Sequence, residues 1–179
     1  MVFGRVITEE SKSYWKCFVL RKATRKGDLK LLKRIHEKFT VTPDMIRDDD
    51  NFLFQLAVSK GYFEICKWFV VEFGLEKDDV KALNNYALYL AAENGNIELC
   101  KWIIDEFGCT KDEIDSRNGI LLTCAVFSNN IELCRYVHSV FKFDRTQTRH
   151  CFSWAVQNKN LELLSWLCGT FDEDITKYV

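Results

Sequence analysis

One short pattern recurs through this chain, and its period predicts the architecture. Four copies begin at Leu56, Leu90, Cys124 and Trp154, and a fifth, degenerate copy begins at Lys22. The alanine that follows each of these residues falls at positions 23, 57, 91, 125 and 155, so the steps between copies are 34, 34, 34 and 30. A repeat of roughly 20–50 residues is typical of proteins in which similar structural units stack on one another.

Each copy reads as two helices separated by a tight turn. Leu88 and Ala91 follow helical spacing in the first segment of one copy, and Leu99 and Ile103 do so in the second. Gly95 lies between the segments, where a positive φ or a small side chain is required. One proline and eight glycines are too few for the turns of an all-β sandwich. The predicted fold class is therefore all-α, a repeat solenoid of about five helix–turn–helix units.

We expect one domain over residues 1–179. The first repeat carries basic residues where inner repeats are apolar, and Arg34 takes the place of Trp68 and Trp102. A solenoid must cover its terminal faces with polar groups, so this substitution is typical of a capping repeat. The predicted boundaries are an N-terminal cap at 1–16, repeats at about 17–50, 51–84, 85–118, 119–148 and 149–171, and a C-terminal tail at 172–179.

The composition indicates a folded protein with a sizeable core. Hydrophobic residues make up 47% of the chain and aromatic residues 14%, which argues against disorder. No apolar run approaches the roughly 20 residues that span a bilayer, and residues 1–10 lack the features of a signal peptide. We therefore expect a soluble, cytoplasmic protein that does not bind membranes, with its eight cysteines as free thiols.

The repeated pattern A-x-x-x-G-x-(I/F)-E-(I/L)-C-K-W resembles the core of the ankyrin repeat, over about residues 17–171. Tetratricopeptide repeats share the period, but their early tryptophan and closing proline have no counterpart here. The chain also departs from ankyrin repeats, because no copy carries Thr-Pro-Leu-His before the alanine and no connector has an Asp-Gly hairpin. Thr42-Pro43 reads as a helix start, and Thr110 to Glu113 as a capping box. We therefore expect short helical turns in place of β-fingers.

The segments around the connectors narrow this resemblance. The patterns E-F-G-L-x-x-x-D-V at 72–80 and N-N-Y-A-L at 84–88 are similar to segments of divergent ankyrin-type arrays from large DNA viruses of amoebae and protists. That resemblance implies a viral factor that engages a host protein in the host cytoplasm.

The sequence contains none of the common catalytic motifs G-x-x-x-x-G-K-(S/T), G-x-G-x-x-G, G-x-S-x-G and H-E-x-x-H. His36 and His138 occupy one repeat position and read as half-buried helix residues. Cys66, Cys100 and Cys134 share another position, and we expect them in the core. Stacked helices lie about 8–10 Å apart, too far for a disulfide or a shared zinc ion. We expect no catalytic residue, no metal site and no cofactor.

The resemblance to ankyrin repeats implies that a partner protein binds the concave groove, which the first helices and the turns before them line. Carried over by position, the predicted binding residues are Asn51, Gln55, Ser59, Lys60, Asn85, Tyr89, Glu93, Asn94, Thr123, Phe127, Ser128, Arg149, Ser153, Gln157 and Asn158. Phe127 stands where other repeats have polar residues, so it is either an exposed hot spot or folded back onto Val126 and Tyr136. The predicted function is a non-catalytic protein–protein interaction scaffold.

The start of the chain is basic. Residues 1–40 carry eleven Lys and Arg against four Asp and Glu, a net charge of +7, which leaves −8 for the remainder of a chain whose total is −1. Helical spacing groups seven of these cations: Lys16, Arg21, Lys22, Arg25, Lys26, Lys30 and Lys33. They form either a solvated cap, the favoured interpretation, or a patch that binds nucleic acid or an acidic surface, the alternative function. We expect a protein partner and a monomer or weak dimer.

Overall fold

A computed structural model describes residues 9–115 and 119–178. The chain divides into an N-terminal unit, Met1–Asp79, and a C-terminal unit, Val80–Val179. The described residues form helices and no β-strand, so the predicted all-α fold class is confirmed. Parts of the predicted boundaries, namely 1–8 of the cap, 116–118 of the third repeat and 179 of the tail, lie outside the described residues.

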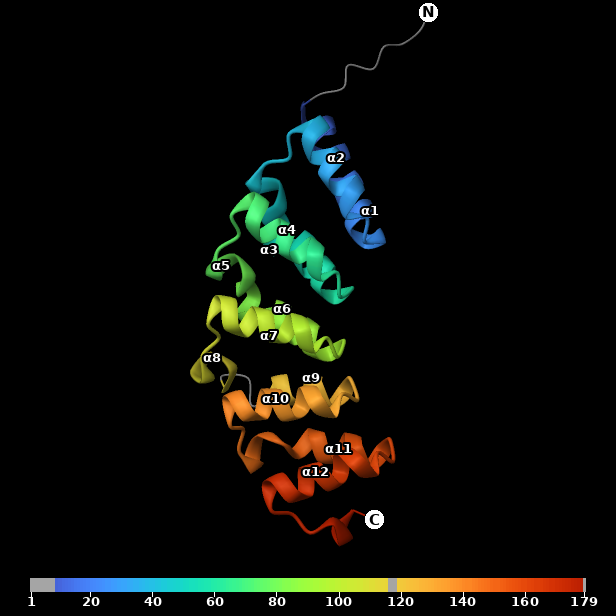
Figure 1. The fold of residues 1–179 in the computed structure, drawn as a ribbon, viewed down its shortest axis with the longest axis vertical. Helices are drawn as coiled ribbons and strands as arrows, with labels where there is room; N and C mark the ends of the chain where they lie inside the picture. The colour runs from blue at the N-terminus through green and yellow to red at the C-terminus, as the bar shows by residue number, and fades with distance from the viewer. Residues whose placement is uncertain (1–8, 116–118, 179) are drawn as a thin grey trace, which may run out of the picture. The chain divides into compact units, whose positions relative to one another are not determined.

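The N-terminal unit is built from two helix pairs, each joined by a tight turn (Figure 1). Its helices are α1 (Glu9–Lys26), α2 (Leu29–Phe39), α3 (Pro43–Ser59), α4 (Phe63–Phe73) and the single turn α5 (Lys77–Val80), which ends just past the unit. Helix α1 packs against both its partner α2 and the first helix of the next pair, α3.

The C-terminal unit contains three helix pairs with short helical connectors between them (Figure 1). The pairs are α6 (Ala82–Glu93) with α7 (Ile97–Phe107), α9 (Ile120–Phe127) with α10 (Ile131–Phe141), and α11 (Arg149–Gln157) with α12 (Leu161–Phe171). The connectors are α8 (Lys111–Asp115) and the 3₁₀ helix η1 (Arg145–Gln147), and a second 3₁₀ helix, η2 (Ile175–Lys177), follows the last pair. The first helices pack side by side in the order α6, α9, α11.

The turn inside each pair has the predicted geometry. Gly95 has φ +67° and Asn129 has φ +59°, so both occupy the left-handed region that the tight turn requires. The residue after the turn caps the second helix: the side chains of Asn96, Asn130 and Asn160 each accept a hydrogen bond from a backbone N–H three residues ahead. The recurrence of asparagine at this position makes each of these second helices begin at the same place in the repeat.

Short helices occupy the connectors, as predicted. Pro43 is the first residue of α3, and it follows Thr42 in extended conformation. Glu113 and Thr110 form the predicted reciprocal capping box: the Thr110 N–H donates to the Glu113 carboxylate at 2.8 Å, and the Glu113 N–H donates to the Thr110 hydroxyl at 3.4 Å. The connectors therefore return the chain through helical turns where ankyrin repeats have β-fingers.

A left-handed turn without glycine precedes the regular part of α3 and of α6. Asp49, Asp50 and Asn51 have φ between 53° and 62°. Leu83 and the two asparagines after it have φ between 54° and 64°. Aspartate and asparagine tolerate this conformation better than other side chains, because they can hydrogen-bond locally. The regular part of each of these first helices therefore begins only after Asn51 and after Asn85.

Small side chains lie where first helices meet. Ala23, Ala57, Ala91, Ala125 and Ala155 are all buried, and so are larger apolar residues of the second helices such as Leu99 and Leu133. An alanine leaves room for two helix backbones to approach closely.

In the described part of the chain, no helix is both long and apolar enough to cross a membrane.

Two glycines test how closely the connectors pack. Gly119 has φ +72°, and a Cβ added there would come within 2.5 Å of the Gln147 carbonyl oxygen. Gly74 has φ +59°, but a Cβ there would meet no atom within 4 Å. We expect Gly119→Ala to reduce the free energy of unfolding by about 3 kcal/mol and Gly74→Ala by about 1 kcal/mol, the left-handed penalty alone. Urea denaturation followed by circular dichroism measures both, and equal losses would contradict the described packing.

Candidate binding surface

The first helices of the C-terminal unit expose a row of apolar side chains. Tyr86 on α6 and Ile120 on α9 are each 40% exposed, and Phe127 at the end of α9 is 46% exposed. Equivalent positions on α6, α9 and α11 lie next to one another, because these helices pack side by side. We name this set the solvent row, and it consists of Tyr86, Leu90, Ile120, Cys124, Phe127 and Trp154.

Phe127 contacts the next repeat. Its ring stacks on Trp154 of α11, with centroids 6.0 Å apart and planes inclined by 29°. Trp154 is itself half-buried, so the two rings form one accessible aromatic surface. The structure therefore keeps Phe127 exposed, and its part in binding stays a prediction.

Four predicted binding residues are buried, so the expectation that they are exposed is wrong. Asn51, Asn85, Tyr89 and Thr123 are no more than 9% exposed. Each precedes a residue of the solvent row, or its equivalent in α3, by one position, which is about 100° around a helix. Two of these residues contact elements that follow them in the chain. Asn51 Nδ2 donates to the Asp79 carbonyl of α5 at 3.2 Å, and the Thr123 hydroxyl lies 3.7 Å from Cys151 Sγ of α11.

The other predicted binding residues are accessible to different degrees. Several of them use their side chains to bond the carbonyls of their own helix. Asn94 Nδ2 donates to the Leu90 carbonyl at 2.8 Å, and Ser128 Oγ donates to the Ala125 carbonyl at 2.7 Å. The half-buried members are Gln55, Ser59 and Ser128, and the exposed members are Lys60, Glu93, Asn94, Phe127, Arg149, Ser153, Gln157 and Asn158. Their role in binding also stays a prediction.

Arg149 and Ser153 are exposed although their equivalents in the other repeats of the C-terminal unit are buried. Both line a pocket of about 250 Å³ together with the aromatic pair Phe152 and Tyr178, whose rings stack at 5.1 Å. Tyr178 belongs to the predicted C-terminal tail, which an ion pair between Arg145 and Glu173 also ties to η1. The tail therefore stands partly in the place that a following repeat takes elsewhere in this unit.

The basic residues of the first repeat are divided between two helices. Lys22, Arg25 and Lys26 are exposed on α1, whereas Lys30 and Lys33 are exposed on α2. Arg21 pairs with Asp49 at 3.3 Å and lies 4.6 Å from the centre of the Phe52 ring, and Lys16 is half-buried. The seven cations therefore do not form one continuous stripe along a single helix.

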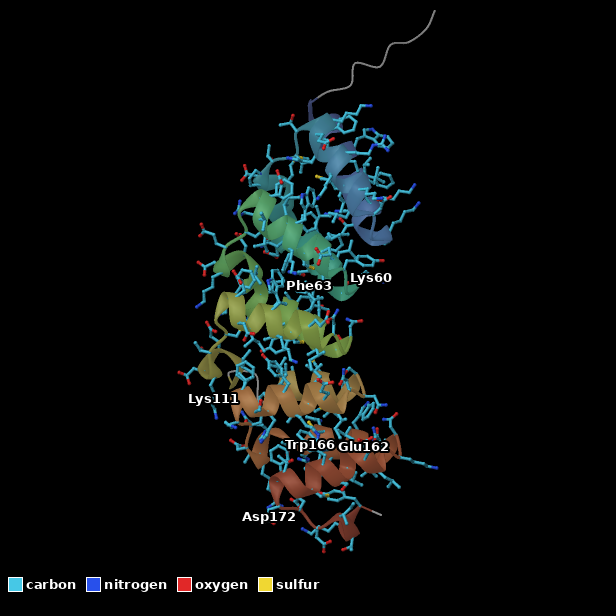
Figure 2. All side chains as sticks on the ribbon, viewed as in Figure 1. Lys60, Phe63, Lys111, Glu162, Trp166 and Asp172 are labelled. Atoms are coloured by element: carbon cyan, nitrogen blue, oxygen red, sulfur yellow. The ribbon has the colours of Figure 1, made fainter. Side chains whose placement is uncertain are left out.

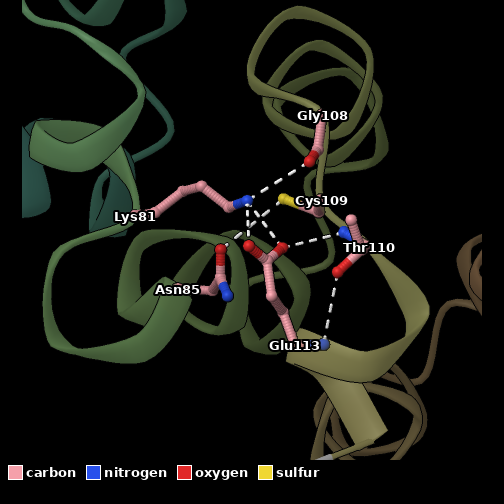
Figure 3. Close-up of polar contacts among 6 residues, drawn as sticks. All are labelled: Lys81, Asn85, Gly108, Cys109, Thr110 and Glu113. Atoms are coloured by element: carbon pink, nitrogen blue, oxygen red, sulfur yellow. Dashed lines mark hydrogen bonds and ion pairs between the residues drawn. The ribbon is translucent and has the colours of Figure 1, made fainter.

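Lys81, at the start of α6, ties the connector to helix α7 (Figure 3). Its ammonium donates to both oxygens of the Glu113 carboxylate, at 2.7 and 2.6 Å, and to the Gly108 carbonyl at 3.2 Å. Gly108 ends α7, and Glu113 belongs to α8. The Lys81 side chain is 9% exposed, so its charge depends on these partners. Lys81, and to a lesser degree Thr110, lowers the pKa of the Glu113 carboxyl.

The N-terminal unit contains the same arrangement one repeat earlier. Arg47 Nε donates to the Asp79 carboxylate at 3.0 Å, and its Nη2 donates to the Gly74 carbonyl at 2.7 Å. We name each such arrangement a connector latch. Neither latch was predicted from the sequence, because the charged members of each stand 32 residues apart and look like separate surface charges. Arg47 and Lys81 are equivalent positions of successive repeats, as are Asp79 and Glu113, and this shared register is the signal that could have found them.

The cysteine and histidine ladders occupy the predicted environments. Cys66, Cys100 and Cys134 are fully buried, which confirms their place in the core. Burial raises the pKa of the Cys100 and Cys134 thiols to about 12. His36 and His138 are half-buried, as predicted. Within the residues that the structure describes, no three side chains of His, Cys, Asp or Glu are grouped so as to hold a metal ion.

The comparison with protein families gives the same repeat spacing as the sequence. A family model described as ankyrin repeats, in three copies, matches residues 20–115, 54–145 and 88–178. The starts of the three matches are evenly spaced, at the same step as the first four alanines, and together the matches extend from residue 20 to residue 178. No curated protein matches the chain.

The connector latch of the C-terminal unit can be tested by removing one charge. Glu113→Gln leaves the buried Lys81 ammonium without its carboxylate, and we expect the free energy of unfolding to fall by about 2 kcal/mol at neutral pH. Because folding lowers the Glu113 pKa, its stabilisation is present above the ordinary glutamate pKa and is lost as the pH falls through the lowered value. The difference between wild type and variant should therefore shrink on acidification.

Urea denaturation at several pH values measures this difference. Glu106→Gln, which changes an exposed carboxylate in the last turn of α7, is the matched control and should alter stability by less than about 0.5 kcal/mol. Equal effects of the two variants would contradict a stabilising role for the latch.

Thiol reactivity tests the burial of the cysteine ladder. Thiols react as thiolates, so a raised pKa and burial both slow alkylation. At about pH 8, where an ordinary cysteine is partly ionised, we expect iodoacetamide to modify half-buried Cys17 and Cys109 well before Cys66, Cys100 and Cys134. Peptide mass spectrometry after short exposures gives the order, and in urea all five should react alike. Early modification of Cys100 in the folded protein would contradict its buried position.

Proposed function

This chain belongs to the ankyrin repeat family, and from that membership we propose that it is a non-catalytic scaffold that binds a partner protein through the exposed faces of its first helices. Ankyrin repeats generally mediate protein–protein interaction, and the family is typically non-catalytic. We also propose that residues 1–179 act as one repeat domain, as a monomer or a weak dimer.

The observation that carries the proposal is the solvent row. Tyr86, Ile120 and Phe127 expose large apolar side chains on neighbouring helices, while buried residues such as Asn85 and Tyr89 pack inward. Exposed apolar side chains that lie together favour association, because burying them against a partner removes them from water. Aromatic side chains also supply much of the energy in measured interfaces. The Phe127 and Trp154 pair is therefore the proposed centre of the contact.

Polar residues border this centre. Glu93 and Asn94 follow the row at the end of α6, and Gln157 and Asn158 do so at the end of α11. A polar rim around an apolar centre is the usual composition of a protein–protein interface. Of the predicted binding residues, we retain those that are accessible and add Tyr86, Leu90, Ile120, Cys124 and Trp154 from the solvent row.

The source and the partner are narrower proposals. We propose a viral factor that engages a host protein in the host cytoplasm, as an adaptor or a decoy. This proposal rests only on the resemblance drawn in the sequence analysis for the segments at 72–80 and 84–88. Nucleic-acid binding through the basic residues is the alternative function, and their division between α1 and α2 weakens it.

Phe127→Ala tests the scaffold function. The substitution removes the exposed ring and leaves Trp154 in place, so we expect partner affinity to fall by about 2 kcal/mol, or about thirtyfold. Affinity capture from a eukaryotic lysate, with nuclease present, followed by mass spectrometry compares the variant with wild type. Purified partner then gives the dissociation constant.

Leu161→Ala is the matched control, because Leu161 is an exposed apolar residue of the same unit that lies on the second helix α12. It should retain the proteins that wild type captures. A captured set that Phe127→Ala leaves unchanged would overturn the proposed binding surface.

A further inference from the structure

The exposed first-helix face of the N-terminal unit has a different chemistry from the solvent row. Moving back by one repeat from Phe52 and Leu56 leads to Phe18 and Lys22, and from Ser59 to Arg25. Helices α1 and α3 pack together, so these positions are neighbours in this unit. Where the C-terminal unit presents Leu90 and Phe127, α1 therefore presents a lysine and an arginine.

Four cations gather at the ends of α1 and α3. Lys22, Arg25 and Lys26 are exposed in the last turns of α1. Lys60 is exposed at the end of α3, where Figure 2 labels it. No ion pair joins these four to any side chain of the described residues, in contrast to Arg21, which Asp49 partly neutralises. Unpaired cations on one face produce a positive potential that attracts anionic groups.

Aromatic side chains lie beside the cations. Trp15 is 59% exposed and Phe18 is 48% exposed, and their rings meet edge to face with centroids 5.8 Å apart. Phe18 precedes Lys22 on α1 by about one helical turn, and Trp15 precedes it by about two. This part of α1 therefore offers an apolar contact and a group of cations within a few turns of the same helix.

We propose that this face binds an acidic segment of the partner protein, in which two or more Asp or Glu residues stand next to an apolar side chain. The carboxylates pair with Lys22, Arg25, Lys26 and Lys60, and the apolar side chain packs on Trp15 and Phe18. The inference rests on the proposed scaffold function and names the chemistry of the partner for the N-terminal unit.

The arrangement of charge favours an acidic protein segment over nucleic acid. Asp48, Asp49 and Asp50 are exposed just before the regular part of α3, so a phosphate chain that followed the first helices would meet carboxylates. Neighbouring helices lie about 8–10 Å apart, so the four cations span a short distance. Nucleic-acid affinity grows with the number of phosphates neutralised, whereas a short acidic segment needs few contacts.

Selection from a random peptide library tests the inference directly. Peptides selected on the intact wild-type protein are sequenced, and the most enriched one is labelled with fluorescein and titrated by fluorescence anisotropy. We expect enrichment of Asp and Glu beside an aromatic or aliphatic residue. Affinity should also fall as salt rises from about 50 mM to about 300 mM, because salt screens exposed charges.

A matched pair of variants separates local contact from net charge. Lys22→Glu/Arg25→Glu and Lys30→Glu/Lys33→Glu change the net charge equally, on α1 and α2 respectively. We expect the first to weaken binding of the labelled peptide about tenfold or more and the second to weaken it less than threefold, about 0.6 kcal/mol. Lys22→Gln/Arg25→Gln, which avoids acidic residues in the last turns of α1, should lose affinity in the same direction if the reversed variant unfolds.

The outcomes distinguish this inference from the proposed function. Neutral apolar peptides that lose binding with Phe127→Ala, but not with the α1 variant, would overturn the acidic segment and leave the scaffold function in place. Equal losses in the two charge-reversed variants, or tighter binding of a fluorescein-labelled oligonucleotide of similar length, would also overturn the acidic segment. A library that yields no peptide on wild type would contradict both.

Discussion

Each helix pair of this protein has an apolar face that it cannot cover alone, and the fold depends on neighbouring pairs covering it. Alanine recurs at the same place in each repeat, and a small side chain there allows first helices to approach closely; Ala91 and Ala125 are buried on the packed helices α6 and α9. This burial is local. Within a repeat, each connector latch joins the end of the second helix to the first helix of the same pair and to the short helix after it.

The same packing determines which side chains can meet a partner. On α6, Asn85 and Tyr89 are buried, and this leaves Tyr86 and Leu90 on the accessible side. A rotation of one residue therefore separates a side chain that builds the core from one that is available for recognition. The accessible positions are equivalent in every repeat, but at two of them α1 has Lys22 and Arg25 where α9 has Cys124 and Phe127. Two chemistries thus come from one backbone plan.

Much of the fold could be predicted from the sequence, because the regular spacing of the alanines, the turn at Gly95 and the capping box at Thr110 are local signals. Which side of each first helix faces the core could not be predicted. Residues 49–51 and 83–85 adopt left-handed geometry, which the repeat pattern does not indicate. The comparison by position with ankyrin repeats places Asn51 and Asn85 at the surface, but the structure buries both. The latches were hidden for another reason: pairing of Lys81 with Glu113 depends on a packing that joins residues 32 apart.

The short reach of the contacts also has a mechanical consequence. Side-chain bonds such as that of the Tyr62 hydroxyl with the Arg25 carbonyl extend about one repeat along the chain, here 37 residues. A repeat array of this kind unfolds under tension one repeat at a time, because the interface between two repeats can open without breaking distant ones first. Under tension, one repeat that comes loose would lengthen the chain by roughly 110 Å, since an extended residue spans about 3.3–3.6 Å. The repeat that makes the fold recognisable is thus also the unit in which it would yield to force.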